Sequence, residues 1–316
     1  MASKKSLLGS LPIISQLKKS VGLQRGMLVA GIALTLLFLL TAALAPLIAP
    51  YGGTQRFDVT QAPPSPTHIW GTTAGGYDVF SRTIWGTQTA FLVIVVAVAL
   101  SIFLGVFLGL LSGYIGGWLD RILVVVADAI YAFPTLLLAM VMSIALNQGR
   151  SSMWSSIFST AISITVVFIP QYYRVIRAET IRLKAEPFVE SAIVVGASSI
   201  RIMARHIYKN ATRTLPLIFT LNASEAILTL AGLGFLGFGI EPSTAAEWGY
   251  DLQHAQSDAT AGIWWTGLFP GLAIVFTVLG LTLLGESMND LNDPRLRGRK
   301  KAKKNAAKKN KELVEA

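Results

Sequence analysis

The polar residues that could do chemistry are concentrated in one segment, EPFVESAIVVGASSIRIMARHIYKN at residues 186–210, between long apolar runs. Pro187 suits the first position of a helix, because its missing N–H costs nothing there, and Glu190 then lies in the first turn, where the helix dipole favours negative charge. Gly196 tolerates the left-handed conformation that ends many helices. The segment therefore predicts a short helix with an acidic first turn. Residues at spacings of three and four form its apolar face: Val189, Ala192, Ile193 and Gly196.

A second short helix is expected after this glycine, with Ser198 or Ser199 as its N-cap. Its apolar stripe comprises Ile200, Met203 and Ile207, and its basic stripe comprises Arg201 and Arg205. Two interpretations fit these patterns. The helix pair rests on lipid head groups at the membrane surface, or it inserts into a groove of a soluble partner protein.

Two carboxylates, Asp128 and Glu225, stand inside apolar runs and are expected at membrane depth. An acidic residue at the centre of a span costs about 2.5–3.5 kcal/mol on insertion scales, so such residues usually face a polar interior and carry a function. For Asp128, a structural pair with a nearby arginine is preferred over contact with cargo, while the role of Glu225 is open. The two acids also motivate a rival hypothesis, a proton-coupled secondary transporter, although the inverted repeats of such proteins are not detected.

Residue types that support enzyme chemistry are sparse. The three histidines, His68, His206 and His254, are far apart, with two predicted on one side of the membrane and one on the other. The chain has no cysteine, which excludes thiolate metal sites and cysteine nucleophiles. It also lacks H-E-x-x-H, G-x-S-x-G and P-loop motifs. We therefore predict no catalytic residue, no metal site and no cofactor bound by this chain, so any ATP that drives it is hydrolysed by another subunit.

Long apolar stretches must position these residues. Of the 316 residues, 53% are hydrophobic and 14% are charged, against about 25% charged in soluble domains. A membrane span needs about 20 predominantly apolar residues. Six stretches qualify, at residues 27–51, 83–119, 122–149, 151–173, 214–240 and 259–285. The sequence thus predicts an all-α membrane protein with six transmembrane helices.

Basic residues set the expected orientation. With six spans, all but three of the 27 Lys and Arg residues fall on one side, the exceptions being Arg56, Arg82 and Arg150. Basic loops stay cytoplasmic, so both termini are predicted to lie inside the cell.

Five parts of the chain follow from these spans. They are a cytoplasmic N-terminal segment at 1–26, a first transmembrane helix at 27–50, an outer loop at 51–84, a five-helix core at 85–288 and a basic cytoplasmic tail at 289–316. A cytoplasmic loop at 178–211 belongs to the core. The tail is expected to bind anionic lipid rather than nucleic acid, because no aromatic or folded reading surface accompanies its charges.

Glycine and proline predict local features of the spans. Gly105, Gly109 and Gly113 are four residues apart, so they share one helix face and let a neighbouring helix approach closely. Pro134 and Pro170 are expected to kink or end their helices.

Several stretches carry a resemblance to a known family. They are LAPLIAPY at 44–51, GTTAGGYDVFSRTIWGTQTAFLV at 71–93, DAIYAFPTLLLAM at 128–140, FLGFGIEPSTAAEWG at 235–249, WWTGLFPGLAIVFTVLG at 264–280 and NDPRLRG at 292–298. The chain resembles the permease subunits of ABC importers for dipeptides and oligopeptides. Segment 186–210 is similar to the EAA loop of that family, which reads Glu-Ala-Ala, three residues and Gly. Here it reads Glu190-Ser191-Ala192 and then Gly196, and Tyr208-Lys209 stand where the family often has Leu-Pro.

This resemblance implies a fold, partners and a mechanism. The fold is the type I ABC importer permease, placed in the bacterial inner membrane. The partners are a second permease, two ATP-binding subunits that hydrolyse ATP and an extracytoplasmic substrate-binding protein. The cargo is a dipeptide or oligopeptide, with nickel, haem or glutathione as alternatives. Residues that couple to the ATPase are then Glu190, Ser191, Ala192 and Gly196, with Arg201 and Arg205 contacting either the ATPase or lipid.

Overall fold

A computed structural model describes residues 23–146 and 152–292. Within these ranges the chain is helical, apart from loops and two isolated β-bridges, Arg56 with Tyr77 and Thr72 with Asp78. Most of segment 1–26, most of the basic tail 289–316 and Arg150 lie outside the described residues.

Five helices are long and apolar enough to cross a membrane. They are α2 (Leu23–Ala43), α4 (Val79–Ile115), α7 (Met153–Lys184), α11 (Leu215–Phe235) and α13 (Trp265–Asn292). Two further apolar helices, α5 (Gly117–Tyr131) and α6 (Thr135–Leu146), meet at a bend of 98° and make a sixth candidate span when they are counted as one. The expected all-α fold with six apolar spans is confirmed if the bent pair counts as one span, although the helix boundaries differ from the predicted ones.

The bend between α5 and α6 has a local cause in the sequence. Pro134 stands between the two helices, where it lacks an N–H donor and disfavours helical geometry at the residue before it. The kink expected at this proline is confirmed, and a single continuous helix over 122–149 is wrong. Pro170, in contrast, stays inside α7 without ending it.

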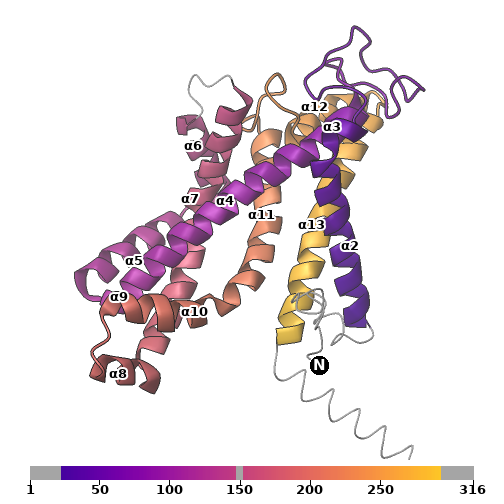
Figure 1. Ribbon diagram of the computed structural model, residues 1–316. Coiled ribbons are helices and arrows are strands. Elements are labelled where there is room, and N and C mark those ends of the chain that lie inside the picture. The colour runs from indigo at the N-terminus through magenta and orange to yellow at the C-terminus, as the bar shows by residue number, and fades with distance from the viewer. Residues whose placement is uncertain (1–22, 147–151, 293–316) are drawn as a thin grey trace, which may run out of the picture.

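Helices α4 and α7 have the most extensive contact of any helix pair in the described part of the chain. In Figure 1 they lie together at the lower left and diverge toward the top, where α4 begins beside α3 (Ala45–Ile48) and α7 begins beside α6. A Cβ placed on Gly105 would lie 2.4 Å from Cβ of Tyr172, and one placed on Gly113 would lie 2.8 Å from Cβ of Thr180. The glycine stripe therefore lets the two backbones approach closely, as predicted.

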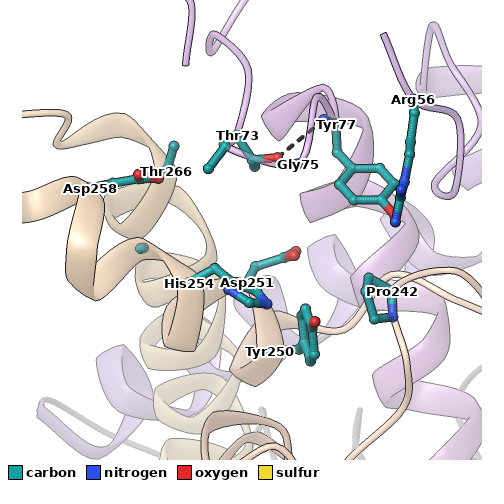
Figure 2. A pocket seen from close by; sticks show the side chains of 12 residues that line it. Arg56, Thr73, Gly75, Tyr77, Pro242, Tyr250, Asp251, His254, Asp258 and Thr266 are labelled. Atoms are coloured by element: carbon teal, nitrogen blue, oxygen red, sulfur yellow. Dashed lines mark hydrogen bonds between the residues drawn. The ribbon is translucent and has the colours of Figure 1, made fainter. Parts of the chain in front are cut away.

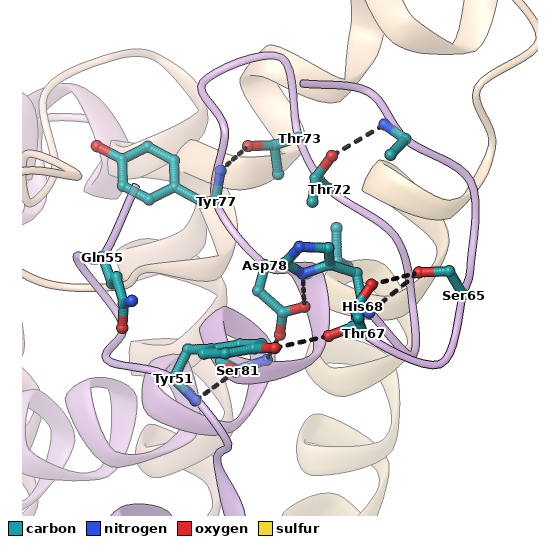
Figure 3. Close-up of polar contacts among 12 residues, drawn as sticks. Tyr51, Gln55, Ser65, Thr67, His68, Thr72, Thr73, Tyr77, Asp78 and Ser81 are labelled. Carbon is teal, nitrogen blue, oxygen red and sulfur yellow. Dashed lines mark hydrogen bonds and ion pairs between the residues drawn. The ribbon is translucent and has the colours of Figure 1, made fainter. Parts of the chain in front are cut away.

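Helix α4 begins at Val79, four residues before the predicted start, because Asp78 caps it. Oδ2 of Asp78 accepts a hydrogen bond from the Ser81 N–H at 2.8 Å, which satisfies a donor that the first helical turn leaves free. Oδ1 of the same carboxylate lies 2.9 Å from Nδ1 of His68 (Figure 3). The loop between α3 (Ala45–Ile48) and α4 is thereby tied to the start of α4.

The shorter helices lie at opposite ends of the bundle (Figure 1). At one end, α12 (Trp248–Thr260) lies beside the loop between α3 and α4. At the other end lie α8 (Pro187–Val194), α9 (Ser199–Ile202), a π-helix η2 (Met203–Ile207), α10 (Tyr208–Ala211) and a 3-10 turn η3 (Thr212–Thr214). The described ends of α2 and α13 lie at this second end as well. The described ends of α2 and α13 thus lie on the side of loop 178–211, while the placement of the two termini and the cytoplasmic identity of that side stay predictions.

Candidate functional site

Helix α8 is built as its sequence predicts. Glu186 is the N-cap residue, Pro187 is the first helical residue and Glu190 lies exposed in the first turn. Gly196 has a φ of +77°. Its N–H donates to the Ile193 carbonyl at 2.9 Å, and the N–H of Ala197 donates to the Ala192 carbonyl at 3.0 Å. This pair of bonds is the Schellman motif, which satisfies the last carbonyls of the helix and needs a left-handed residue at this position.

Only part of the predicted apolar face of α8 is buried. Val189 is fully buried and Ala192 is 8% exposed, whereas Ile193 is 55% exposed. The helix has just eight residues and contacts the rest of the chain on the side of Val189 and Ala192. The apolar face predicted from the spacing is therefore buried at Val189 and Ala192 and exposed at Ile193.

The second helix departs from a regular α-helix, and this changes which residues are buried. Ser198 is the N-cap residue, but its side chain makes no capping hydrogen bond. Ile202 and Ile207 are buried, while Ile200 is 75% exposed. The π-helix η2 carries hydrogen bonds over five residues, so it brings Ile202 and Ile207 onto the same side. The predicted stripe of Ile200, Met203 and Ile207 assumed a regular α-helix, whereas the structure buries Ile202 with Ile207 and leaves Ile200 exposed.

Exposed apolar side chains form a tip on this end of the chain, which we call the apolar tip. It comprises Phe188, Ile193, Val194, Val195 and Ile200, and Val194 and Val195 are 87% and 83% exposed. Exposed apolar clusters with polar neighbours are typical of surfaces that contact another protein or a membrane. Sequence reasoning concentrated on the charges here and missed the tip, although the run Ile193–Val195 before a glycine was its signal.

The remaining predicted residues of this segment surround the tip. Ser191 is exposed, and its hydroxyl donates to the Pro187 carbonyl at 2.9 Å. Arg201 and Arg205 are exposed and make no ion pair within the described residues. They are free to meet acidic groups of a partner or of lipid.

A buried apolar cluster attaches the tip to the membrane helices. Val189 and Ala192 of α8 and Ile202 and Ile207 of the next turns pack with residues of the long helices. Those residues are Val106 of α4 and Ile176 and Leu183 of α7. Because packed interiors transmit displacement rather than absorb it, a movement of α8 would be passed to α4 and α7.

Asp128 pairs with an arginine, as preferred from the sequence. Nη2 of Arg174 donates to Oδ1 of Asp128 at 2.6 Å, and the guanidinium lies 4.3 Å from the centre of the Tyr131 ring. A second pair joins the same two helices, since Nε and Nη2 of Arg177 bond the two oxygens of Asp120 at 2.5 and 2.6 Å. Together the two pairs hold α5 against α7, and the second one was not foreseen.

Glu225 occupies the middle of α11 and is exposed. No ion pair or hydrogen bond to its carboxylate occurs among the described residues. The two intramembrane acids therefore differ in their partners. Asp128 forms an ion pair with Arg174, whereas Glu225 forms none within the described residues.

A cavity of about 160 Å³ lies at the opposite end, between α12 and the loop before α4 (Figure 2). The side chain of Asp251 points into this space, and its Oδ1 accepts a hydrogen bond from Nε of Arg82 at 2.8 Å. Arg82 is 1% exposed, so the pair is buried and joins α4 to α12. Burial raises the pKa of Asp251, although the positive charge of Arg82 acts to lower it. Sequence reasoning had placed Arg82 only as a basic residue of the outer side.

Glu247 caps α12 from a buried position. Its two carboxylate oxygens accept hydrogen bonds from the N–H groups of Gly249 and Tyr250, each at 2.8 Å. Burial raises the pKa of Glu247 from the ordinary value of 4.5 to about 8.

These features define a class of protein, a multi-span membrane protein with an exposed apolar tip packed directly against its spanning helices. Comparison with known proteins identifies the class more closely. Residues 105–298 match the family described as binding-protein-dependent transport system inner membrane component. The chain is 38% identical to the glutathione transport system permease protein GsiD of Shigella flexneri serotype 5b and 36% identical to GsiD of Escherichia coli O6:K15:H31. Each match spans 265 residues, 83% of this chain and 84% of the relative.

The chain belongs to this family of binding-protein-dependent permeases. It is a permease of the peptide-type ABC importer class and a multi-pass protein of the inner membrane. Permeases of this family work in general with a second permease, ATP-hydrolysing subunits and a substrate-binding protein. Among the residues that the structure describes, no group of three or more His, Asp or Glu side chains could hold a metal ion.

Proposed function

We propose that this chain forms one half of the pathway of an ATP-driven importer for small peptides, together with a second, different permease. Two partner ATPase subunits hydrolyse the ATP, and an extracytoplasmic binding protein delivers the cargo. The GsiD relatives carry glutathione in their names, and glutathione is itself a small peptide. That observation favours glutathione over nickel or haem as the alternative cargo.

We infer that the apolar tip and its polar neighbours are the surface that docks on an ATPase subunit. The observation that carries this inference is the combination of Val194, 87% exposed, with a buried cluster that attaches the same helix to α4 and α7. A helix presented in this way fits a groove in a soluble partner, with the apolar residues as anchors. The coupling site then comprises Glu190, Ser191, Ala192 and Gly196, with Arg201 and Arg205 at its edge.

Each residue of this site has a distinct task. Ala192 packs inward, and Gly196 ends the helix so that the tip projects. Glu190 and Ser191 lie on the exposed side, where they contact the rim of the groove. The arginines contribute charge that steers docking and adds little affinity where it stays solvated.

Transport by the intact complex in lipid vesicles tests the proposed cargo and the proposed energy source. Uptake of a labelled small peptide is expected with ATP and the loaded binding protein, and no uptake is expected with a proton gradient alone. Uptake driven by the proton gradient without ATP would favour the secondary-transporter hypothesis instead.

A matched pair of variants tests the docking surface. Val194→Asp puts a charge on the tip and is expected to weaken ATPase binding by about 2 kcal/mol or more, the size of a hot-spot substitution. Val59→Asp makes the same change at a valine that is 53% exposed in the loop before α4, and it is expected to leave ATPase binding unchanged. Equal ATPase binding by both variants would show that the tip is not the docking surface.

A further inference from the structure

A cavity of about 140 Å³ lies beside the break between α5 and α6. Its walls come from three parts of the chain, namely the break between α5 and α6, helix α7 and helix α11. The residues that matter here are Tyr131, Phe133 and Thr135 at the break, Phe168 and Gln171 on α7, and Glu225 on α11. The volume corresponds to a few water molecules at about 30 Å³ each, so it admits one end of a small molecule.

The cavity lies at membrane depth. Glu225 has ten residues of α11 on either side, which at 1.5 Å per residue puts it about 15 Å from each end of the helix. Irregular backbone at this depth, such as the break at Pro134, is tolerated where it lines a cavity or is covered by protein. An exposed carboxylate at this depth likewise requires water or a polar partner.

The electrostatics of the cavity come from Glu225. Arg174 stacks on Tyr131 in the cavity wall, but its charge is engaged by Asp128. The Glu225 carboxylate has no such partner within the described residues. The cavity thus combines one uncompensated negative charge with aromatic rings and the amide of Gln171.

This combination selects a particular ligand chemistry. A carboxylate attracts a cation, aromatic rings favour an ammonium over a hydrated metal ion, and an amide side chain donates to a carbonyl oxygen. The free amino terminus of a peptide presents an ammonium group next to a carbonyl.

We propose that this cavity is a cargo subsite in the translocation pathway, in which Glu225 binds the amino-terminal ammonium group of the peptide and Gln171 the adjacent carbonyl. The proposal rests on the proposed function, since it needs a peptide to pass along this face of α11. It predicts that the permease itself discriminates between free and blocked amino termini, in addition to any selection by the binding protein.

The test uses the intact complex in lipid vesicles, with the binding protein and ATP. Two versions of one labelled peptide are compared, one with a free amino terminus and one N-acetylated, at concentrations that load the binding protein equally. Wild type is expected to import the free peptide at least about tenfold faster, equivalent to about 1.4 kcal/mol. Glu225→Gln removes the charge at nearly constant shape and is expected to abolish this preference, whereas Glu225→Asp keeps part of it.

Glu241→Gln is the matched control, because Glu241 is an exposed glutamate outside this cavity. It is expected to keep the wild-type preference. Equal import of both peptides by wild type, or an unchanged preference in Glu225→Gln, would overturn the subsite. Loss of the second permease on purification of Glu225→Gln would also overturn it, because the acid would then belong to a subunit interface.

The outcome distinguishes this inference from the proposed function. Failure of wild type to import either peptide with ATP contradicts the proposed function and the subsite together. Import that requires ATP but ignores the amino terminus contradicts only the subsite.

Discussion

Replacing Gly105 with alanine is predicted to force α4 away from α7. The added Cβ would lie 2.4 Å from Cβ of Tyr172, 3.0 Å from the Tyr173 nitrogen and 3.1 Å from the Ile169 carbonyl oxygen. Ordinary contacts between carbon atoms are about 3.5–4.0 Å, so the gap is short by more than about 1 Å. None of these atoms is the far end of a flexible side chain, and the clash must therefore move a backbone.

The loss of stability expected for Gly105→Ala follows from two opposing effects. Overpacking of this kind costs about 1–3 kcal/mol, while alanine is a better helix former than glycine by up to about 1 kcal/mol. Gly26 in α2 has nothing within 4 Å of its added Cβ, so Gly26→Ala shares the gain without the clash. The two variants should therefore differ in stability by about 1–3 kcal/mol.

The assay is the apparent melting temperature of each purified variant in one detergent. Gly105→Ala is expected to melt several degrees below Gly26→Ala, because each kcal/mol shifts the midpoint by about 2–4 °C in large domains. Indistinguishable midpoints would refute the claim that the glycine stripe sets the distance between α4 and α7.

Three further predictions concern the opposite end of the bundle and the orientation of the chain. Arg82→Ala leaves Asp251 buried without its partner and is expected to destabilise the protein by about 3–5 kcal/mol. The double variant with Asp251→Asn is expected to recover part of this loss. Denaturation of both variants measures the two free energies of unfolding. The pKa of Glu247 in the folded protein is about 8, above its ordinary value of 4.5. Folding therefore favours the protonated carboxyl group. The stability that this group contributes is lost as the pH rises from about 4.5 to about 8. Glu247→Gln is then expected to raise the melting temperature more at pH 9 than at pH 5, and an equal effect at both would contradict the raised pKa. Cysteines introduced at Ser199 and Ser257 are expected to differ when intact cells are labelled from outside, with only Ser257 reacting; the reverse result would invert the orientation.

Local signals in the sequence predict much of this structure. Pro187 and Gly196 mark the ends of α8, Pro134 marks the break between α5 and α6, and the glycine spacing marks the crossing of α4 with α7. Each of these features depends on backbone conformation or on one helix face, which a single stretch of sequence specifies.

Other features depend on contacts between distant segments and were missed for that reason. Arg82 and Asp251 are 169 residues apart in the chain, and nothing in either neighbourhood indicates the other. The π-helix that ends at Ile207 departs from regular helical periodicity, so the spacing alone does not predict that Ile202 is buried and Ile200 exposed. The run Ile193–Val195 signals an apolar tip, but the 87% exposure of Val194 depends on how the neighbouring helices are placed.

Cross-linking in the assembled complex shows whether the apolar tip contacts an ATPase subunit. A photoreactive side chain at Val194 is expected to cross-link the ATPase subunit in native membranes, and the same group at Val59 is expected not to. Cross-links from Val194 to lipid alone, with the ATPase present in the complex, would contradict the account.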